Sequence, residues 1–323
     1  MSFHVVFVRT DRLGETLLTL PALHALRAAR PDCRLTVVVH PALRELLADH
    51  PDVTEVVAEL TPQGSWWSQA WRLGRVWRSW KAQAILISNP KKTYHLAAWL
   101  AGIPCRVGYD RKWGGLLTHR LPDRKALGDR HEVEYNLDLV KTLGIPVALP
   151  PVLQLPVRAS DDARVDRLLG PWHVRSDHRL VAVHPWTSNP RKQWPLERFR
   201  TLLQRLQQVP TVRPVLIGGL EESRRLDEVL SPQAASVVNL VGQVSLGELA
   251  AVLRRVRVLV SNDSGPMHVA AAVGTKVVAL FGTAEAGSHP NRWGPWGEGH
   301  TVIRKPLEHI SVDDVMDAVT RGL

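Results

Sequence analysis

Apolar residues in the first half of the chain alternate between short continuous runs and longer stretches with helical periodicity. Short apolar runs are typical of strands buried in a parallel sheet. The predicted strands are residues 3–9, 35–40, 83–88 and 105–109. Stretches in which apolar residues recur every three or four positions predict amphipathic helices between the strands. The predicted helices lie near 15–29, 41–49, 66–81, 91–101 and 131–143.

A stretch at 146–157 (PVALPPVLQLPV) interrupts this alternation, and its four prolines are typical of an interdomain linker. A second alternation of strands and helices follows it. The predicted strands are 180–183, 213–217, 256–260 and 277–281, and the predicted helices are 160–169, 195–208, 221–230, 246–255, 266–273 and one opened by Ser311 and Asp314. Two such alternations predict an α/β fold with two doubly wound domains, 1–155 and 156–323.

The stretch 256–282 (VRVLVSNDSGPMHVAAAVGTKVVALFG) has the order strand, polar turn, short helix and strand. Pro266 suits the first turn of a helix, and Gly274 suits its left-handed end. Asp263 and Ser264 then lie between the carboxyl end of a strand and a helix start, where free backbone N–H groups attract phosphate. The alternative is an ordinary helix capped by Asp or Ser.

Composition adds a preference for an anionic partner. The chain of 323 residues has 41 Lys and Arg against 31 Asp and Glu, a formal net charge of +10. This excess favours a nucleic acid, an anionic lipid or a phosphorylated substrate. Two cysteines form no disulfide framework. The first apolar run is too short for a secretory leader, and no apolar segment approaches the ~18 residues of a membrane helix. We therefore expect a cytoplasmic protein.

The segment from Leu60 to Tyr109 contains no acidic residue but six tryptophans and several basic residues. A projection of 66–81 at ~100° per residue places the tryptophans and aliphatic residues on a wide side. The narrow opposite face carries Ser68, Arg72, Arg75 and Ser79. Basic residues beside Trp are typical of a helix at anionic lipid headgroups. The alternative is a helix that faces the core and has a solvated basic edge.

The stretch NDSGPMHVAAAVGTKVVALFG and four collinear segments resemble glycosyltransferase family 9, the ADP-heptose:lipopolysaccharide heptosyltransferases. The segments are VVFVRTDRLGETLLTLPALHALRAARP near the start, HEVEYNLDLVKTLGI at 131–145, HPWTSNPRKQWPLERF at 184–199 and IGGLEE at 217–222. The resemblance implies a GT-B fold, in which two Rossmann-like domains face a cleft. It also implies that the first domain binds the acceptor and the second the donor, with the last helix packing back on the first domain.

The implied activity is an inverting, metal-independent transfer of heptose from ADP-heptose to the inner core of lipopolysaccharide. The segment 9–15 (RTDRLGE) lies between the first predicted strand and helix. Glu15 is placed to accept a proton from an acceptor hydroxyl, or only to complement the helix dipole. The family has a catalytic Asp at this position, so the resemblance implies that Glu15, one methylene longer, is the general base. Asp11 is the second candidate.

The loop after the first strand of the second domain carries two hydroxyls and two cations, at Thr187, Ser188, Arg191 and Lys192. This combination suits phosphate oxygens, although a solvated polar loop has the same composition. The resemblance implies that Thr187 and Ser188 contact the diphosphate. It also implies that Lys192 neutralises charge on the leaving nucleoside diphosphate.

The remaining donor candidates are a carboxylate and the helix start of the signature. A carboxylate after Gly218-Gly219 can hold a ribose hydroxyl, and Glu222 fits the family spacing better than Glu221. The signature candidates are Asp263, Ser264, Gly265, Pro266, Met267 and His268. The sequence has no Asp-x-Asp motif and no zinc-ligand spacing. We expect no metal and no cofactor, with an ADP-sugar as donor substrate.

The acceptor candidates are basic residues of the first domain: Lys91, Lys92, Arg106, Arg111 and Lys112. The expected acceptor is an anionic glycolipid of the Kdo-lipid A type, reached by a monomer in peripheral contact with the inner membrane, without a nucleic acid partner. Two alternatives stay open. One is the same fold with another nucleotide-sugar donor, as in a hexose transferase or an epimerase. The other is a non-catalytic protein that binds saccharide or nucleic acid.

Overall fold

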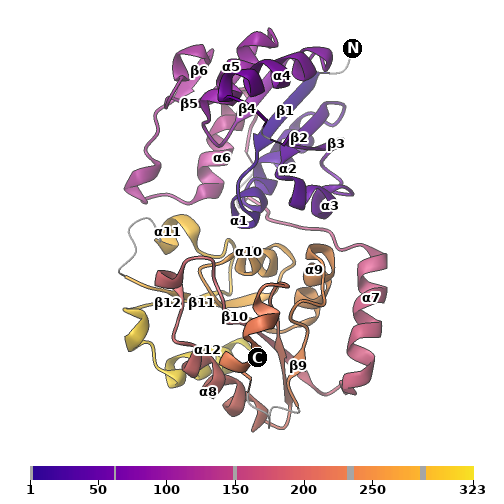
Figure 1. Ribbon diagram of the computed structural model, residues 1–323, viewed down its shortest axis with the longest axis vertical. Coiled ribbons are helices and arrows are strands. Elements are labelled where there is room, and N and C mark those ends of the chain that lie inside the picture. Colours follow the sequence, from indigo (N-terminus) through magenta and orange to yellow (C-terminus); the bar gives the residue numbers. More distant parts are fainter. Residues whose placement is uncertain (1–2, 62, 148–150, 231–235, 284–288) are drawn as a thin grey trace. The chain divides into compact units, whose positions relative to one another are not determined.

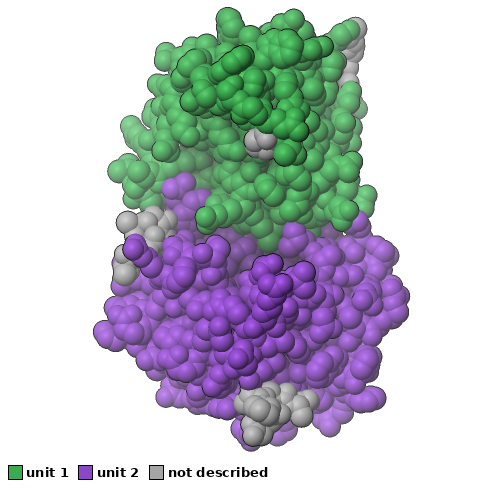
Figure 2. All heavy atoms as spheres, viewed as in Figure 1, with its two compact units in different colours: residues 1–152 green, residues 153–323 purple. Residues whose placement is uncertain are grey.

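The computed structural model describes residues 3–61, 63–147, 151–230, 236–283 and 289–323. The chain divides into two compact units, unit 1 (Met1–Val152) and unit 2 (Leu153–Leu323), which Figure 2 shows in green and purple. Each unit has its own parallel sheet flanked by helices (Figure 1). This agrees with the predicted α/β class and with two doubly wound halves. In the described residues, no helix is both long and apolar enough to cross a membrane.

The described part of unit 1 forms a six-stranded parallel sheet in the order β3-β2-β1-β4-β5-β6. The strands are β1 His4–Arg9, β2 Arg34–Val39, β3 Glu55–Ala58, β4 Ala84–Ile87, β5 Cys105–Tyr109 and β6 His119–Leu121. The α-helices are α1 Leu13–Leu17, α2 Leu20–Ala29, α3 Arg44–Leu47, α4 Trp66–Ser79, α5 Lys92–Leu100 and α6 Glu132–Lys141. The 3-10 helices are η1 Pro41–Leu43, η2 Gly114–Leu116 and η3 Lys125–Leu127. Strand order reverses between β1 and β4, where doubly wound sheets bind ligands at the carboxyl ends.

Unit 2 repeats this topology in the order β12-β11-β10-β7-β8-β9, with the reversal between β7 and β10. The strands are β7 Arg179–His184, β8 Val212–Leu216, β9 Val238–Asn239, β10 Val258–Asn262, β11 Lys276–Phe281 and β12 Thr301–Arg304. The α-helices are α7 Ala159–Leu169, α8 Leu196–Gln207, α9 Leu246–Arg255, α10 Gly265–Ala272, α11 Pro290–Trp293 and α12 Val312–Gly322. The 3-10 helices are η4 Gly170–Trp172, η5 Pro190–Lys192, η6 Glu222–Glu228 and η7 Leu307–His309.

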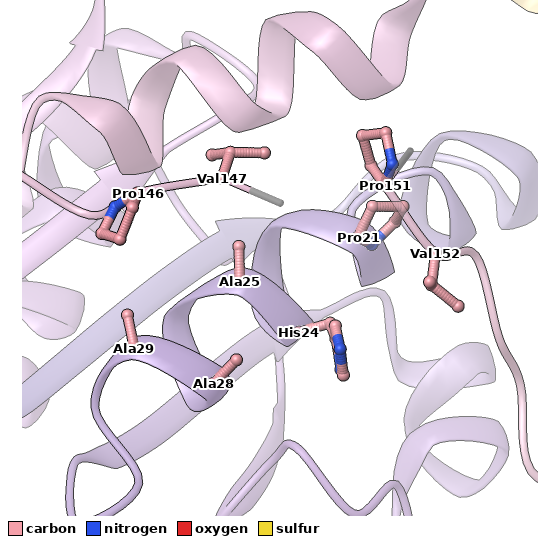
Figure 3. A pocket seen from close by; sticks show the side chains of 9 residues that line it. All are labelled: Pro21, His24, Ala25, Ala28, Ala29, Pro146, Val147, Pro151 and Val152. Carbon is pink, nitrogen blue, oxygen red and sulfur yellow. The ribbon is translucent and has the colours of Figure 1, made fainter. Parts of the chain in front are cut away.

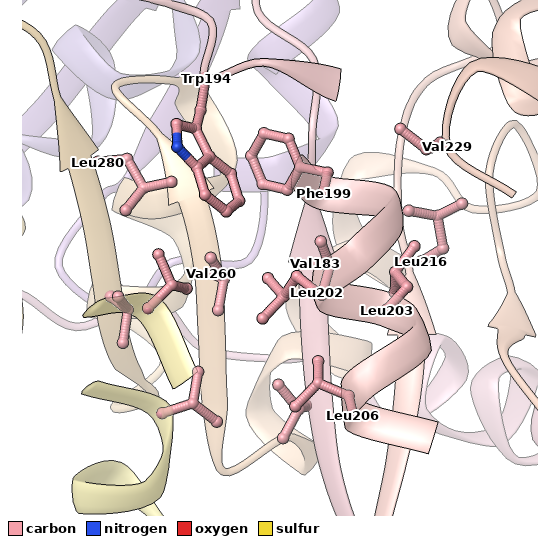
Figure 4. Packing of buried hydrophobic residues seen from close by; sticks show 14 of the residues in the cluster. Val183, Trp194, Phe199, Leu202, Leu203, Leu206, Leu216, Val229, Val260 and Leu280 are labelled. Atoms are coloured by element: carbon pink, nitrogen blue, oxygen red, sulfur yellow. The ribbon is translucent and has the colours of Figure 1, made fainter. Parts of the chain in front are cut away.

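The core of unit 2 joins α8 to the central strands through fully buried aromatic and aliphatic side chains (Figure 4). The rings of Trp194 and Phe199 meet edge to face, with centroids 4.7 Å apart. The indole N–H of Trp194 donates to the Ile310 carbonyl at 2.9 Å, so this buried donor is satisfied. Trp194 therefore anchors the loop that precedes α8 and carries Lys192.

Two segments that were predicted as continuous α-helices have a different form in the structure. The helix expected at 15–29 is broken into α1 and α2, because Pro21 lies in the first turn of α2 and cannot donate its own backbone hydrogen bond. The α-helix expected at 221–230 is the 3-10 helix η6, which has non-helical backbone angles at Arg225.

The central strands agree with the predicted strands, but the edge strands were not predicted. β3, β6, β9 and β12 are two to four residues long and half exposed or exposed along much of their length. A short strand that is not buried on both faces lacks the continuous apolar run that marks a central parallel strand.

The last helix, α12, packs against α8, β10, β11 and β12 of its own unit. Its buried residues Val315, Ala318 and Val319 belong to the core of unit 2. The expectation that it also packs on the first domain stays a prediction.

Candidate functional site

The signature of the sequence lies at the strand-order reversal of unit 2. β10 ends at Asn262, and α10 begins at Gly265. Asn262 is fully buried and holds both neighbouring loops, since its Oδ1 accepts from the Trp194 N–H at 2.9 Å and its Nδ2 donates to the Pro185 carbonyl at 2.7 Å. Asn262 thus fixes the loop after β7, residues 185–194, beside the start of α10.

The start of α10 has no side-chain cap. Ser264 occupies the N-cap position, but its hydroxyl makes no hydrogen bond to the helix. It lies instead 2.9 Å from the Ser261 hydroxyl and 3.1 Å from Nδ1 of His184. The alternative of a helix capped by the Ser264 hydroxyl is therefore wrong for this turn. A helix start without an internal cap keeps backbone N–H capacity for an anion.

Lys192 and Asp263 form an ion pair at this helix start. The Lys192 ammonium lies 2.7 Å from Oδ2 of Asp263, and the two side chains are 21% and 9% exposed. The pair joins residues 71 positions apart in the chain. An ammonium has three donors, so this contact aims Lys192 while leaving donor capacity for phosphate oxygens.

The other donor candidates occupy different environments in unit 2. Oγ1 of Thr187 accepts from the Asn189 N–H at 3.4 Å, and Ser188 is exposed. Oε2 of Glu222 lies over Gly219, where an added Cβ would be only 2.8 Å away. Glu222 follows β8, the strand next to β7, so it lies at the same carboxyl end of the sheet as the signature.

Two signature residues lie in the interior of the unit rather than at its surface. Met267 is fully buried, and its N–H donates to the Ser264 carbonyl at 3.2 Å. His268 is 4% exposed. Their placement makes them supports of the helix start. Gly265 and Pro266, which form the first turn of α10, are partly exposed.

The reversal in unit 1 is built around the buried Arg9. Its guanidinium donates to the Ser88 hydroxyl at 2.7 Å and to Oε1 of Glu132 at 2.8 Å, and its Nε lies 3.2 Å from Oδ2 of Asp11. Glu132 is fully buried and also receives a hydrogen bond from Lys125 at 2.7 Å. These contacts tie the ends of β1 and β4 to the start of α6.

Glu15 and Asp11, the two candidate bases, differ in their surroundings. Asp11 pairs with Arg9 and accepts a hydrogen bond from Asn89. Glu15 lies half-buried in the first turn of α1. Burial raises the pKa of Glu15, and its own backbone N–H and the charge of Arg9 oppose this rise. A carboxylate with a raised pKa is better matched to proton transfer near neutral pH.

The acceptor candidates of unit 1 separate into three kinds. Lys91 donates to the Thr10 hydroxyl at 3.1 Å, next to Asp11, and the Lys92 ammonium lies 4.1 Å from the centre of the Trp66 ring. Arg106 donates to the backbone carbonyls of Ile103 and Leu116 at 2.5 and 2.8 Å, so its guanidinium braces the fold. The third kind is exposed and lies after β5: Arg111 is 3.5 Å from Asp123, and Lys112 has a φ of 57°.

The sequence reasoning did not predict several buried polar residues of both sites. They are Arg9, Ser88, Asn89, Glu132, Asn136 and Asn262. The contact of the buried His184 with Ser264 was not predicted either. An Arg and an Asn at the ends of buried strands are a usable signal, because buried polar groups require partners. In the described residues, no cluster of three or more His, Cys, Asp or Glu side chains could hold a metal ion.

A pocket of about 400 Å³ lies in unit 1 between α2 and residues 146–147 and 151–152 of the proline-rich stretch (Figure 3). Its lining is apolar apart from His24, whose Nδ1 lies 3.0 Å from Asp52. The lining residues are Pro21, His24, Ala25, Ala28, Ala29, Pro146, Val147, Pro151 and Val152. This pocket contains none of the predicted donor or acceptor residues.

Comparison with known proteins relates the chain to one family. The model of glycosyltransferase family 9 (heptosyltransferase) matches residues 74–317. The chain is similar to lipopolysaccharide heptosyltransferase 2 of Escherichia coli (strain K12), with 25% identity over 93% of this chain and 87% of that protein.

Two solved structures share the fold. A family 9 glycosyl transferase from Veillonella parvula has a TM-score of 0.89 at 22% identity, over 99% of this chain and 97% of the other. The E. coli ADP-heptose lps heptosyltransferase II has a TM-score of 0.82 at 22% identity, over 100% and 98% of the two chains.

Proposed function

We propose an activity for this chain from its family and its two sites, since the chain belongs to glycosyltransferase family 9 and is therefore a glycosyltransferase of the heptosyltransferase type. The proposed reaction moves heptose from ADP-heptose to the inner core of lipopolysaccharide, on the cytoplasmic side of the inner membrane. The similar E. coli proteins are named for this donor and this product class, which supports the choice.

The observation that carries the proposal is the Lys192–Asp263 pair beside the uncapped start of α10. Together they supply an ammonium and backbone N–H groups at the strand-order reversal, the place where doubly wound sheets bind ligands. In the proposal, the diphosphate of the donor binds here with Thr187 and Ser188. Glu222 holds a ribose hydroxyl of the nucleoside.

The proposed chemical step is a single displacement at the anomeric carbon. The acceptor hydroxyl oxygen attacks this carbon, and its proton passes to the carboxylate of Glu15. The bond from the anomeric carbon to the diphosphate oxygen breaks, and the electron pair leaves with ADP. Attack from the side opposite the leaving group inverts the configuration. Lys192 stabilises the negative charge that develops on the diphosphate, so the step needs no metal ion in this proposal.

Glu15 is preferred to Asp11 as base because its raised pKa suits proton transfer, whereas Arg9 and Asn89 hold Asp11. For the acceptor, we propose an anionic glycolipid of the Kdo-lipid A type. Lys91 is the favoured contact because its side chain is 43% exposed and its ammonium lies within hydrogen-bond distance of Thr10, next to Asp11. Lys92, Arg111 and Lys112 supply further positive charge.

Thermal unfolding with ADP, UDP, GDP and ADP-heptose tests the donor. A ligand at ~100 times its Kd stabilises by ~2.7 kcal/mol, which raises Tm by several degrees. The expected result is a shift with ADP and ADP-heptose that the Lys192→Ala variant loses, and turnover that survives EDTA. A shift with UDP or GDP instead would replace the donor with that of a hexose transferase or an epimerase. No shift with any nucleotide would favour a non-catalytic binding protein.

A further inference from the structure

Helices α4 and α5 of unit 1 expose several tryptophans. Trp67 and Trp71, one turn apart on α4, are 61% and 53% exposed, and Trp99 on α5 is 52% exposed. Trp113, which follows β5, is 45% exposed and packs edge-on against Trp66 with ring centroids 5.0 Å apart. Isolated exposed apolar residues are common, but a group on neighbouring elements marks an interaction surface.

The packing of the two helices explains why these rings point outward. The inner side of α4 is filled by Ala70, Leu73 and Trp77, which are buried. At Gly74 the helices come so close that an added Cβ would lie 3.0 Å from Cβ of Leu100. Figure 1 shows α4 and α5 as neighbours, and Arg78 joins them through the Leu100 carbonyl. The interior therefore leaves no room for Trp67 and Trp71.

The chemistry of this surface is basic as well as aromatic. No Asp or Glu occurs between Leu60 and Tyr109. The Arg75 guanidinium lies 4.9 Å from the centre of the Trp71 ring, and the Lys92 ammonium lies 4.1 Å from that of Trp66. Arg78 is also exposed. Cations that pack on Trp rings keep their charge at the surface, where an anionic partner can reach it.

We propose that this tryptophan–arginine surface binds the anionic surface of a lipid bilayer. It is defined as Trp67, Trp71, Trp99 and Trp113 with Arg75, Arg78 and Lys92. Trp prefers the headgroup level of a membrane, and each nearby Lys or Arg adds attraction to anionic lipids. A second copy of the chain is a poorer occupant, because it would bring the same positive charges face to face.

Vesicle sedimentation with the full chain tests the proposal. The vesicles contain phosphatidylcholine alone or with 30% phosphatidylglycerol. We expect binding to the anionic vesicles, a blue shift of Trp emission, and weakening by salt. Arg75→Glu with Arg78→Glu should weaken binding by about 30-fold or more, because each basic residue near such a surface contributes about a factor of five. Trp67→Ala with Trp71→Ala should weaken it at least about tenfold and remove most of the blue shift.

The matched control variants substitute exposed residues that lie outside this surface. They are Arg175→Glu with Arg224→Glu for charge and Leu127→Ala with Leu220→Ala for apolar area. Equal binding to neutral and anionic vesicles, or equal losses in controls and surface variants, would overturn the proposal. A dimer that disappears with Trp67→Ala and Trp71→Ala, without vesicle binding, would also overturn it. The assay contains neither donor nor acceptor, so its failure leaves the proposed glycosyl transfer untouched.

Discussion

The two units place side chains of different charge at the same topological position. Arg9 ends β1 and His184 ends β7, and each is the last residue of the strand at which the order of its sheet reverses. Both are buried, at 3% and 6% exposure. Arg9 keeps its charge and is matched by Glu132 and Asp11. Burial lowers the pKa of His184 to about 4, so this side chain is neutral at pH 7 and contacts the Ser264 hydroxyl.

The difference shows how one fold can prepare two kinds of site. In unit 1, a buried cation lies near the carboxylates of Asp11 and Glu15 and opposes the rise in the pKa of Glu15. In unit 2, a neutral histidine leaves the positive charge to Lys192 and the start of α10. The first arrangement holds carboxylates beside a buried cation, and the second leaves positive charge available for an anion. Four substitutions test this comparison.

Glu15→Gln should have the largest effect, because it removes the proposed base of unit 1 and leaves the proposed diphosphate site of unit 2 intact. We expect kcat to fall by about 10²–10⁴-fold, the usual contribution of a general base, with ADP affinity unchanged. Steady-state kinetics and ADP titration measure both quantities. Activity of the wild type should fall as the pH drops through the pKa of Glu15, which burial places above the ordinary Glu value.

The stability of the same variant separates catalysis from misfolding. The folded-state pKa of Glu15 is raised, so its contribution to stability is full below the unfolded pKa and is lost as the pH rises through the folded pKa. Gln cannot ionise, and Glu15→Gln should be at least as stable as the wild type at pH 7. The control is Glu197→Gln, another first-turn carboxylate. Near-normal turnover in Glu15→Gln with a large loss in Asp11→Asn would transfer the role to Asp11.

Glu132→Gln removes the buried carboxylate that pairs with Arg9 in unit 1. It leaves the cations of Arg9 and Lys125 without their shared carboxylate, and removal of one partner from a buried ion pair costs about 3–5 kcal/mol. Urea unfolding should show this loss. The control Glu55→Gln removes the surface pair with Arg34 and should cost less than about 1 kcal/mol. Equal losses in the two variants would mean that the buried pair contributes no more to the free energy of unfolding than the surface pair.

Much of the fold followed from the sequence, because central parallel strands are buried on both faces and read as apolar runs. The edge strands did not, since β3 and β12 are short and partly solvated. At the sites, the helix start at Ser264 followed from local spacing. Its missing cap did not, because it depends on Ser261 and on His184, 80 residues away. The Arg9–Glu132 contact spans 123 positions and needs the completed sheet, so no local pattern announces it.

Lys192→Ala tests the proposed diphosphate site of unit 2. We expect kcat to fall by about 10²–10³-fold, the typical loss when a group that stabilises developing charge is removed. Arg191→Ala, an exposed cation in the same turn, is the matched control and should change kcat little. If Lys192→Ala raised KM and left kcat unchanged, Lys192 would bind the donor equally in the ground and transition states. That result would reject the transition-state role while keeping the site.

His184 gives the smallest of the four effects, and it tests the neutral half of the comparison directly. Its folded pKa of about 4 lies below the unfolded value of about 6.5. Between these two pH values, the unfolded chain therefore binds a proton that the folded chain does not bind. The stability from His184 is therefore present above pH 6.5 and is lost, by up to about 3 kcal/mol, as the pH falls toward 4. Other buried histidines add to the acid loss of the wild type, so the informative quantity is the difference between two Tm-against-pH curves. His184→Asn should show the shallower acid slope, and the exposed-site control His309→Asn should match the wild type. An unchanged slope in His184→Asn would mean that the fold does not lower the pKa of His184, and the contrast with Arg9 would then fail.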